Sequence, residues 1–383
     1  MENAVTLPTA LIWRMRLLPP SETFIQKQAA ALRRFTPFFV GRRRVPGIDI
    51  PLNCSLTVND GGVLGLIKEF SFLYRGLAGT TIRALAQKRP TLIHAHFGID
   101  SCRAIKVASS LQVPLISTFH GYDATQKDFG LRRTRDGRFY LKNRLELQRR
   151  GVHFVAVSEF IRKKLLEKGF PPERTSVQYI GVDVNEFSFW TSRNPAARVL
   201  FVGRLVEQKG CSLLIQAVGR IQAKIPDVEL VVIGDGPERL ALEKQAATHL
   251  RHYRFLGAQP SHVVRQHMRD AAVLSVPSIS VDAGDCEGFG MVFVEAQATG
   301  VPVVSFSNGG IPEAVVHGET GFLAPTGDWR QLASYIAMLL SEESLHHKFS
   351  LAARRHVETN FDLDKQTFKL EDLYCRVVEQ SLM

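Results

Sequence analysis

Cysteine is scarce in this 383-residue sequence, and the five cysteines are widely scattered and form no CxxC pair. This spacing argues against a disulfide framework and against a zinc cluster. Long apolar runs are absent too, since no uncharged apolar stretch reaches the roughly 18 residues of a membrane span. Residues 1–16 also lack an apolar core followed by a small-residue cleavage site. We therefore expect a cytoplasmic protein without a membrane span.

Acidic residues are few in the first half of the chain. Residues 1–185 hold 29 Lys and Arg against 14 Asp and Glu, a difference of +15, whereas residues 186–383 hold 19 against 23, a difference of −4. The basic residues cluster at 42–44, 132–150 and 162–164. Such a surface fits an acidic acceptor or a peripheral contact with the anionic inner face of the cytoplasmic membrane, and a solvated face explains it equally well. Nucleic acid is not expected, because no nucleic-acid-binding motif appears.

Short apolar runs recur along the sequence with helical stretches between them, which is the pattern of βαβ units and parallel sheets. The runs are residues 10–13, 92–95, 114–119 and 154–157, then 199–202, 230–233, 273–276 and 301–306. The length exceeds what one hydrophobic core usually supports. Residues 181–197 show no sustained period and read as a linker. We expect an α/β protein with domains at 1–185 and 186–359 and a helix within 360–383 that packs back on the first domain.

A glycine-bounded loop with two cations follows the run at 199–202. Gly203 and Gly210 enclose Arg204 and Lys209, which lie five residues apart and can both reach one anion. A planar guanidinium suits phosphate, and an ammonium adds a compact charge on a mobile stem. Their predicted task is to hold a diphosphate and to stabilise the charge that grows on it as a sugar departs. An exposed turn is the alternative interpretation.

Glycines also follow two other runs of the second half. Gly234 and Gly236 come after 230–233, and Gly309 and Gly310 come after 301–306 and lead into a helix. Because ligands of open α/β sheets bind beyond the carboxyl ends of the strands, these glycines are candidates for close approach to a nucleotide. For Gly234 and Gly236 a tight turn explains the sequence equally well.

Two carboxylates lie beyond the run at 273–276. Glu287 precedes a predicted helix and Glu295 lies within it, too far along the chain to form an acid/base pair on one helical face. We expect Glu287 to contact sugar hydroxyls and Glu295 to contact the vicinal hydroxyls of ribose, because carboxylates accept hydrogen bonds from diols. The amides of Phe289, Gly290 and Met291 are expected to face phosphate at the helix N-terminus.

These motifs together resemble glycosyltransferase family 4, the retaining nucleotide-sugar transferases of GT-B fold. The matching segments are FVGRLVEQKG, VVIGDGPE, EGFGMVFVE and VVSFSNGGIPE in the second half, and LIHAHFG, STFHGYD and FVAVSEFIRKKL in the first. The segment PSETFI, residues 20–25, is similar to the branch that builds exopolysaccharide and colanic-acid-type polymers. The resemblance implies two Rossmann-like domains facing a central cleft.

The resemblance also implies roles for individual residues. His120 would reach across the cleft to the donor sugar, and Arg204 and Lys209 would contact the diphosphate. Glu287 would contact the sugar and Glu295 the ribose. One departure from the family pattern is that residues 18–24 replace a glycine-rich loop after the first strand. We expect Ser21 or Glu22 to contact the acceptor there.

Histidine spacing raises the question of a metal. His94 and His96 alternate in one strand and, with His120, could imitate a three-histidine zinc site. No acidic or thiol ligand accompanies them at a telling spacing, so neither a metal nor a cofactor is expected.

The predicted activity is retaining transfer of a hexose from a nucleotide-diphosphate sugar to a saccharide or lipid-linked acceptor in bacterial exopolysaccharide or lipopolysaccharide synthesis. A UDP-sugar is favoured as the donor, and GDP-mannose is the alternative. The competing readings are another GT-B enzyme, such as a nucleotide-sugar epimerase or a glycan phosphorylase, and a catalytically silent binding subunit.

Overall fold

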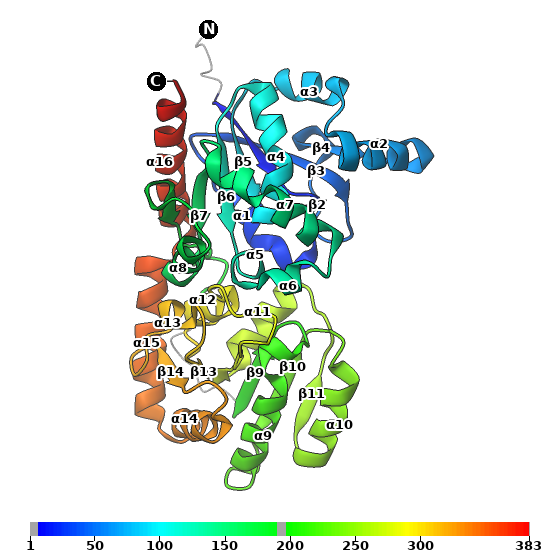
Figure 1. The fold of residues 1–383 in the computed structure, drawn as a ribbon. Helices are drawn as coiled ribbons and strands as arrows, with labels where there is room; N and C mark the ends of the chain where they lie inside the picture. The colour runs from blue at the N-terminus through cyan, green and yellow to red at the C-terminus, as the bar shows by residue number, and fades with distance from the viewer. Residues whose placement is uncertain (1–6, 190–196, 383) are drawn as a thin grey trace. The chain divides into compact units, whose positions relative to one another are not determined.

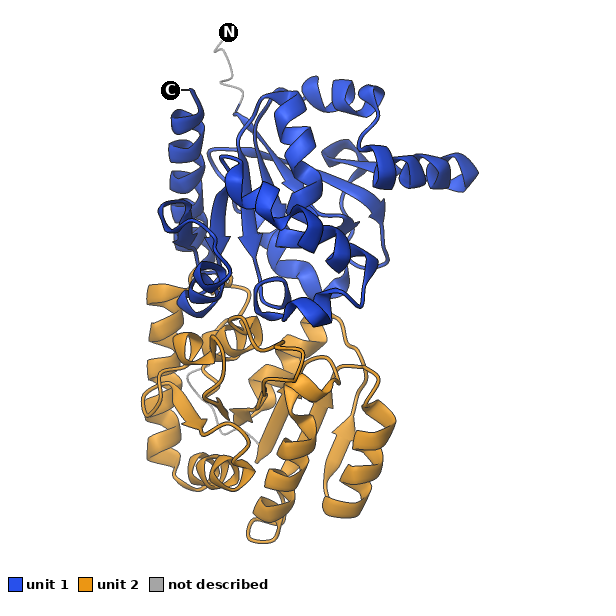
Figure 2. Ribbon diagram, in the orientation of Figure 1, with its two compact units in different colours: residues 1–181, 363–383 blue, residues 182–362 orange. Residues whose placement is uncertain are grey.

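The computed structural model describes residues 7–189 and 197–382 and divides into two compact units (Figure 2). Unit 1 comprises residues 1–181 and 363–383, and unit 2 comprises residues 182–362. The chain therefore passes between the units after residues 181 and 362, where the sequence suggested 185 and 359. The predicted linker, residues 181–197, lies partly outside the described residues.

The sheet of unit 1 has parallel strand pairs in the order β2-β3-β1-β5-β6-β7-β8, with β4 also pairing β3. The strands are β1 (Thr9–Trp13), β2 (Arg16–Leu17), β3 (Thr36–Arg44), β4 (Ser55–Asn59), β5 (Pro90–His96), β6 (Leu115–Phe119), β7 (His153–Ala156) and β8 (Thr175–Val177). In β6 both alternating sets of side chains are buried, which is typical of a parallel sheet covered on both faces.

Helices from both ends of the chain cover this sheet (Figure 1). They are α1 (Thr23–Ala30), α2 (Gly62–Arg75), α3 (Gly79–Ala86), α4 (Gly98–Leu111), α5 (Tyr122–Thr125), α6 (Asp128–Leu131), α7 (Arg135–Arg149), α8 (Glu159–Glu167) and α16 (Leu363–Leu382). Leu370, Leu373, Tyr374 and Val377 place α16 in one apolar core with residues of β1 and β5. Helix α16, red in Figure 1, is thus an integral part of unit 1.

Unit 2 is a second parallel sheet in the order β11-β10-β9-β12-β13-β14. The strands are β9 (Arg198–Val202), β10 (Glu229–Ile233), β11 (Tyr253–Phe255), β12 (Val273–Leu274), β13 (Val303–Phe306) and β14 (Gly321–Ala324). The helices are α9 (Cys211–Gln222), α10 (Arg239–His249), α11 (Ser261–Asp270), α12 (Met291–Ala298), α13 (Ile311–Ala314), α14 (Trp329–Ser341) and α15 (Glu343–Asn360). This is the doubly wound order, in which β9 and β12 flank the point where strand order reverses.

Every apolar run predicted as a strand lies at one of the observed strands β1, β5, β6, β7, β9, β10, β12 and β13. The prediction of two parallel-sheet α/β domains is confirmed. Strand β3 was missed because its last residues, Arg42 to Arg44, read as a surface cluster rather than as a strand end. Strand β14 was missed because its four residues are short and begin with glycine.

Candidate functional site

The loops after β9 and β10 are packed against each other by backbone contacts. The amide of Gly203 donates to the carbonyl of Ile233 at 3.0 Å, and the amide of Leu205 donates to Asp235 at 2.9 Å. A Cβ atom on Gly234 would overlap the carbonyl oxygen of Gly203, and one on Gly236 would overlap that of Leu205. Gly234 and Gly236 therefore leave room for the carbonyl groups of the loop after β9, which occupy the space that a side chain would need.

The loops after β12 and β13 are joined in the same way. The amide of Gly310 donates to the carbonyl of Glu287 at 2.9 Å. A Cβ on Gly309 would overlap that carbonyl oxygen, and one on Gly310 would overlap the carbonyl oxygen of Gly288. Gly309 also has a φ of +61°, a conformation that glycine adopts readily. These contacts fix the backbone of Glu287 against the start of α13.

A side-chain ion pair connects the β9 loop to the β12 loop. The ammonium of Lys209 lies 2.5 Å from Oε2 of Glu287, and the hydroxyl of Ser278 donates to the same oxygen at 3.1 Å. The two side chains are only 20% and 12% exposed. The amide of Ile279 donates to the carbonyl of Gln208 at 2.8 Å and adds a backbone link. The four loops therefore form one continuous rim across the carboxyl edge of the sheet.

The Lys209–Glu287 pair occupies the topological switch point of unit 2. Strand order reverses between β9 and β12, and the two residues come from the loops that follow these strands. Ligands of doubly wound sheets bind in the crevice outside this point. The sequence assigned Lys209 to phosphate and Glu287 to sugar hydroxyls separately, and the structure brings the two groups into direct contact.

Arg204 and the residues around α12 complete the predicted set. Arg204 is exposed, and its guanidinium has no side-chain partner among the described residues. Gly290 is the N-cap of α12 with φ +90°, and Met291 is the first residue of that helix. Glu295 is partly buried one turn further along.

Phe289 differs from its neighbours because its side chain is 2% exposed and packs edge-on against Phe361, with ring centroids 5.1 Å apart. Its ring is therefore part of the core of unit 2. Any contact of Phe289 with a ligand would therefore be made by its backbone.

His120 belongs to unit 1, where it follows β6. Its Nε2 lies 3.0 Å from Nδ1 of His96, and the rings of Phe24 and Phe97 pack against it at centroid distances of 5.0 and 4.6 Å. Its Nδ1 atom is buried and has no hydrogen-bond partner among the described residues. Burial, and then the nearby His94 and Arg14, hold the pKa of His120 well below its usual range. The imidazole is therefore neutral near pH 7 and is suited to a neutral hydrogen bond.

Asp123 holds the loop that presents His120. Its carboxylate accepts hydrogen bonds from the amides of Gly98, His120 and Gly121 at 2.9, 3.1 and 3.0 Å. Burial raises the pKa of Asp123, and these amides oppose that shift. Sequence reasoning missed this residue, although an aspartate three positions after a strand-ending histidine is a typical turn-forming signal.

Both ring nitrogens of His94 lie within hydrogen-bonding distance of hydroxyl groups. Its Nδ1 lies 2.5 Å from the Tyr374 hydroxyl and its Nε2 lies 2.6 Å from that of Thr118. Burial lowers the pKa of His94 to about 3. No group of three His, Cys, Asp or Glu residues placed to hold a metal occurs within residues 7–189 and 197–382.

Glu22 was one of two candidates for an acceptor contact, and in the structure its carboxylate has a partner within unit 1. Glu22 is 6% exposed, and both of its carboxylate oxygens are bonded by the guanidinium of Arg14, at 2.6 and 2.8 Å. Arg14 also pairs with Asp100. Burial lowers the pKa of Arg14, but these two carboxylates outweigh it and raise the pKa, so the guanidinium stays charged. Ser21 is exposed and its predicted contact with the acceptor stays a prediction.

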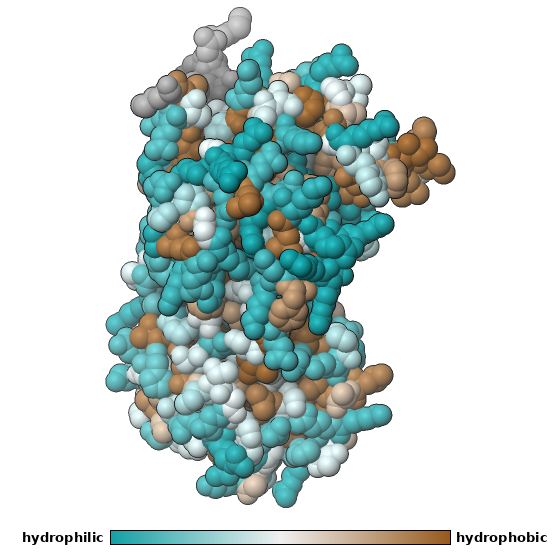
Figure 3. Space-filling view, viewed as in Figure 1, coloured by the Kyte–Doolittle hydropathy of each residue, from teal (hydrophilic) through white to brown (hydrophobic). Residues whose placement is uncertain are grey.

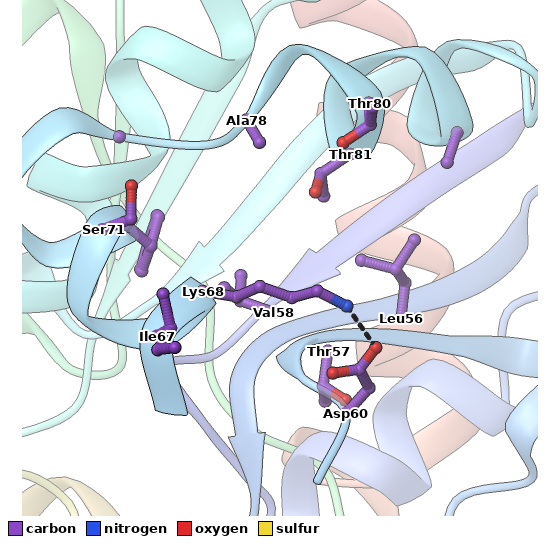
Figure 4. A pocket seen from close by; sticks show the side chains of 13 residues that line it. Leu56, Thr57, Val58, Asp60, Ile67, Lys68, Ser71, Ala78, Thr80 and Thr81 are labelled. Atoms are coloured by element: carbon purple, nitrogen blue, oxygen red, sulfur yellow. Dashed lines mark hydrogen bonds and ion pairs between the residues drawn. The ribbon is translucent and has the colours of Figure 1, made fainter. Parts of the chain in front are cut away.

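A pocket of about 520 Å³ lies elsewhere in unit 1, between β4, α2 and α3 (Figure 4). Figure 4 shows Lys68 extending across it to Asp60, 2.6 Å away. Its lining residues fall within 56–84 and include none of the predicted site residues. Separately, no helix among the described residues is long and apolar enough to cross a bilayer.

Two doubly wound α/β units in one chain, one with a cation and a carboxylate at its switch point, are typical of GT-B transferases. The chain matches the family described as Glycosyl transferases group 1 over residues 185–356 and Glycosyltransferase Family 4 over residues 55–186. It is similar to amylovoran biosynthesis glycosyltransferase AmsK of Erwinia amylovora, with 30% identity over 72% of this chain and 69% of that protein. It is also similar to the putative colanic acid biosynthesis glycosyltransferase WcaL of Escherichia coli K12, with 28% identity over 74% of this chain and 69% of that protein.

Solved structures share the fold. HepE of Anabaena, in complex with UDP and glucose, aligns with a TM-score of 0.75 at 19% identity over 96% of this chain and 100% of that one. Sucrose-phosphate synthase of Thermosynechococcus elongatus aligns with a TM-score of 0.76 at 18% identity over 98% and 100%. The chain belongs to glycosyltransferase family 4. The predicted GT-B fold and the predicted enzyme class, a retaining hexosyltransferase, are confirmed.

Proposed function

We propose that this enzyme transfers a hexose from a UDP-sugar to a saccharide or lipid-linked acceptor in bacterial polysaccharide synthesis, with GDP-mannose as the alternative donor. The observation that carries the proposal is the Lys209–Glu287 pair at the switch point of unit 2. Two relatives named for amylovoran and colanic acid synthesis support the polymer class. A structural neighbour in complex with UDP-glucose supports uridine as the base.

The ion pair gives Lys209 a defined position for the diphosphate. An ammonium has three N–H donors, and Glu287 uses one of them. The remaining donors and the exposed guanidinium of Arg204 would bind phosphate oxygens. Glu287 accepts from Lys209 and Ser278 through one oxygen, which leaves its other oxygen for a sugar hydroxyl.

The remaining residues complete the proposed donor site. Glu295 would accept hydrogen bonds from the ribose hydroxyls. The amides of Phe289, Gly290 and Met291, at the start of α12, would face phosphate, where the partial positive charge of a helix N-terminus favours an anion. His120 would contact the donor sugar.

In the proposed reaction the bond between the anomeric carbon and the diphosphate oxygen breaks, and the acceptor hydroxyl oxygen bonds to the anomeric carbon on the same face. The hydroxyl proton passes to the departing diphosphate. Lys209, Arg204 and the helix amides stabilise charge that grows only in the transition state, which is the kind of interaction that accelerates chemistry.

The test combines binding with turnover. A thermal-shift series with UDP, GDP, ADP and their sugars should show the largest stabilisation with a uridine or guanosine ligand. Release of the nucleoside diphosphate should then depend on adding a saccharide or lipid-linked acceptor. Stabilisation by none of these ligands would refute the proposal. Donor conversion without an acceptor requirement would indicate an epimerase.

A further inference from the structure

Helix α2 carries an unusual amount of exposed apolar surface. Within this helix, whose residues are all described, six large apolar side chains are between 59% and 74% exposed: Val63, Leu64, Leu66, Ile67, Phe70 and Tyr74. At 3.6 residues per turn, all of these except Leu64 fall on one side of the helix. We call these five side chains the α2 stripe. Contiguous exposed apolar surface of this kind marks an interaction site rather than a core.

The helix projects from unit 1 (Figures 1 and 2), and the space-filling view shows apolar side chains gathered over it (Figure 3). A different face anchors it, since Gly65, Glu69 and Phe72 are the buried residues. Glu69 pairs with Arg42 at 3.1 Å and accepts from the side-chain amide Nδ2 of Asn59 at 2.5 Å. The only carboxylate of α2 is thus turned inward, and the α2 stripe lies on the exposed side of the helix, where Ile67 and Tyr74 also border two pockets of unit 1.

Cations lie next to the α2 stripe. Lys68 and Arg75 are on the exposed polar side of α2, and Arg75 lies in its last turn. Lys106 is exposed and lines the same small pocket as Tyr74, near the C-terminal end of α2. Lys68 pairs with Asp60, but both side chains are more than half exposed and such pairs are weak. Asp60 and Glu146 line the same two pockets, so the cations leave a small excess of positive charge beside the α2 stripe.

We propose that α2 docks this enzyme on a bilayer that contains anionic phospholipid, with the α2 stripe in the acyl region and Arg75 and Lys106 at the headgroups. An apolar face beside a cationic face is the pattern of a helix that lies in the membrane interface. A protein partner is less well suited, because a stable interface uses roughly 20–30 residues a side and the α2 stripe offers one helix face. The inference rests on the proposed function, since a lipid-linked acceptor is presented at such a surface.

The experiment is co-sedimentation with vesicles of phosphatidylglycerol and phosphatidylcholine, compared with vesicles of phosphatidylcholine alone. The test variant is Leu66→Gln/Phe70→Gln/Tyr74→Gln, which keeps a helix-forming residue at each position. The matched control is Leu145→Gln/Leu240→Gln/Phe368→Gln, whose apolar side chains are 61%, 74% and 59% exposed on other helices. The test variant should lose affinity for the anionic vesicles on the order of tenfold or more, because binding scales with the apolar area buried. The control should bind like the parent protein.

A charge variant tests the second half of the proposal. Arg75→Gln/Lys106→Gln should weaken binding to anionic vesicles by about fivefold for each lost cation and leave binding to neutral vesicles unchanged. The proposal is overturned if the parent protein binds neither vesicle, or if the control loses as much affinity as the test variant. A parent dimer that becomes monomeric in the test variant during analytical ultracentrifugation would instead assign the α2 stripe to a second copy.

The UDP-induced thermal shift separates this inference from the proposed function. The test variant should keep the shift of the parent protein, because α2 contains no predicted donor-site residue. If the protein binds vesicles but no nucleotide shifts its melting temperature, the proposed function is refuted and the docking role of α2 is still supported.

Discussion

Alanine substitutions at three glycines of unit 2 separate two costs that the structure predicts. At Gly327, φ is +87° and a Cβ would meet nothing within 4 Å, so only backbone strain applies. At Gly310, φ lies outside the left-handed region and a Cβ would overlap the carbonyl oxygen of Gly288, so only steric overlap applies. At Gly309 both apply, because φ is +61° and the overlap is with the carbonyl oxygen of Glu287.

The expected magnitudes differ accordingly. Gly327→Ala should lower the free energy of unfolding by about 1 kcal/mol. The left-handed conformation strains the alanine in the folded state, and the lower conformational entropy of the unfolded chain offsets part of that cost. Gly309→Ala should cost more, because the β12 loop has to move as well. A displacement of roughly 1 Å at Glu287 can reduce turnover by about a hundredfold, so Gly309→Ala and Gly310→Ala should lose nucleoside diphosphate release while Gly327→Ala keeps it.

The assays are urea unfolding and the initial rate of nucleoside diphosphate release for all three variants. Equal stability losses for Gly309→Ala and Gly327→Ala would show that the overlap costs nothing. Full activity in Gly310→Ala would show that packing of the β12 and β13 loops does not position Glu287 for catalysis.

Three further predictions concern charged and buried groups. Lys209→Ala should lower kcat by about 10²–10³ with little change in KM, whereas the exposed Lys244→Ala should leave both unchanged; a raised KM with unchanged kcat would contradict transition-state stabilisation. Because His94 has a pKa of about 3 when folded, the unfolded chain binds more protons between pH 6.5 and 3, and stability should fall by about 2 kcal/mol from pH 7 to pH 5 through this group. In His94→Gln the unfolding free energy, measured in urea at both pH values, should depend less on pH. Glu22→Ala should cost about 3 kcal/mol of stability, since it removes one partner of the buried Arg14, and urea unfolding at wild-type denaturant midpoints would rule this out.

The fold was readable because parallel strands are short, apolar and buried on both faces. The runs at 199–202 and 230–233 carry that pattern, and both are strands. Strand β3 was missed because its last three residues are arginines, and their place in a strand depends on pairing with β2 and β4. The exposure of the α2 stripe could not be predicted either, because the sequence of α2 does not show which of its apolar side chains pack against the rest of unit 1.

The sequence predicted the residue types of the candidate site, but it did not predict which of these residues contact one another. Chain order placed Lys209 and Glu287 beyond strand ends, and only the doubly wound topology makes those two ends adjacent. Gly234 was expected to approach a nucleotide or to form a turn, and its missing side chain makes room for the carbonyl of Gly203. Glu22 lies in a segment that the sequence singled out, but its partner Arg14, which directly follows β1, was not predicted.

The membership of α16 in unit 1 has a consequence for biogenesis. Tyr374 completes both the apolar core of unit 1 and the hydrogen bonds of His94, yet it is translated after the whole of unit 2. During synthesis unit 2 can therefore reach its final packing while unit 1 still waits for its last helix. A nascent chain stalled before residue 363 would expose the unit 1 core to chaperones, and release of those last residues would close it.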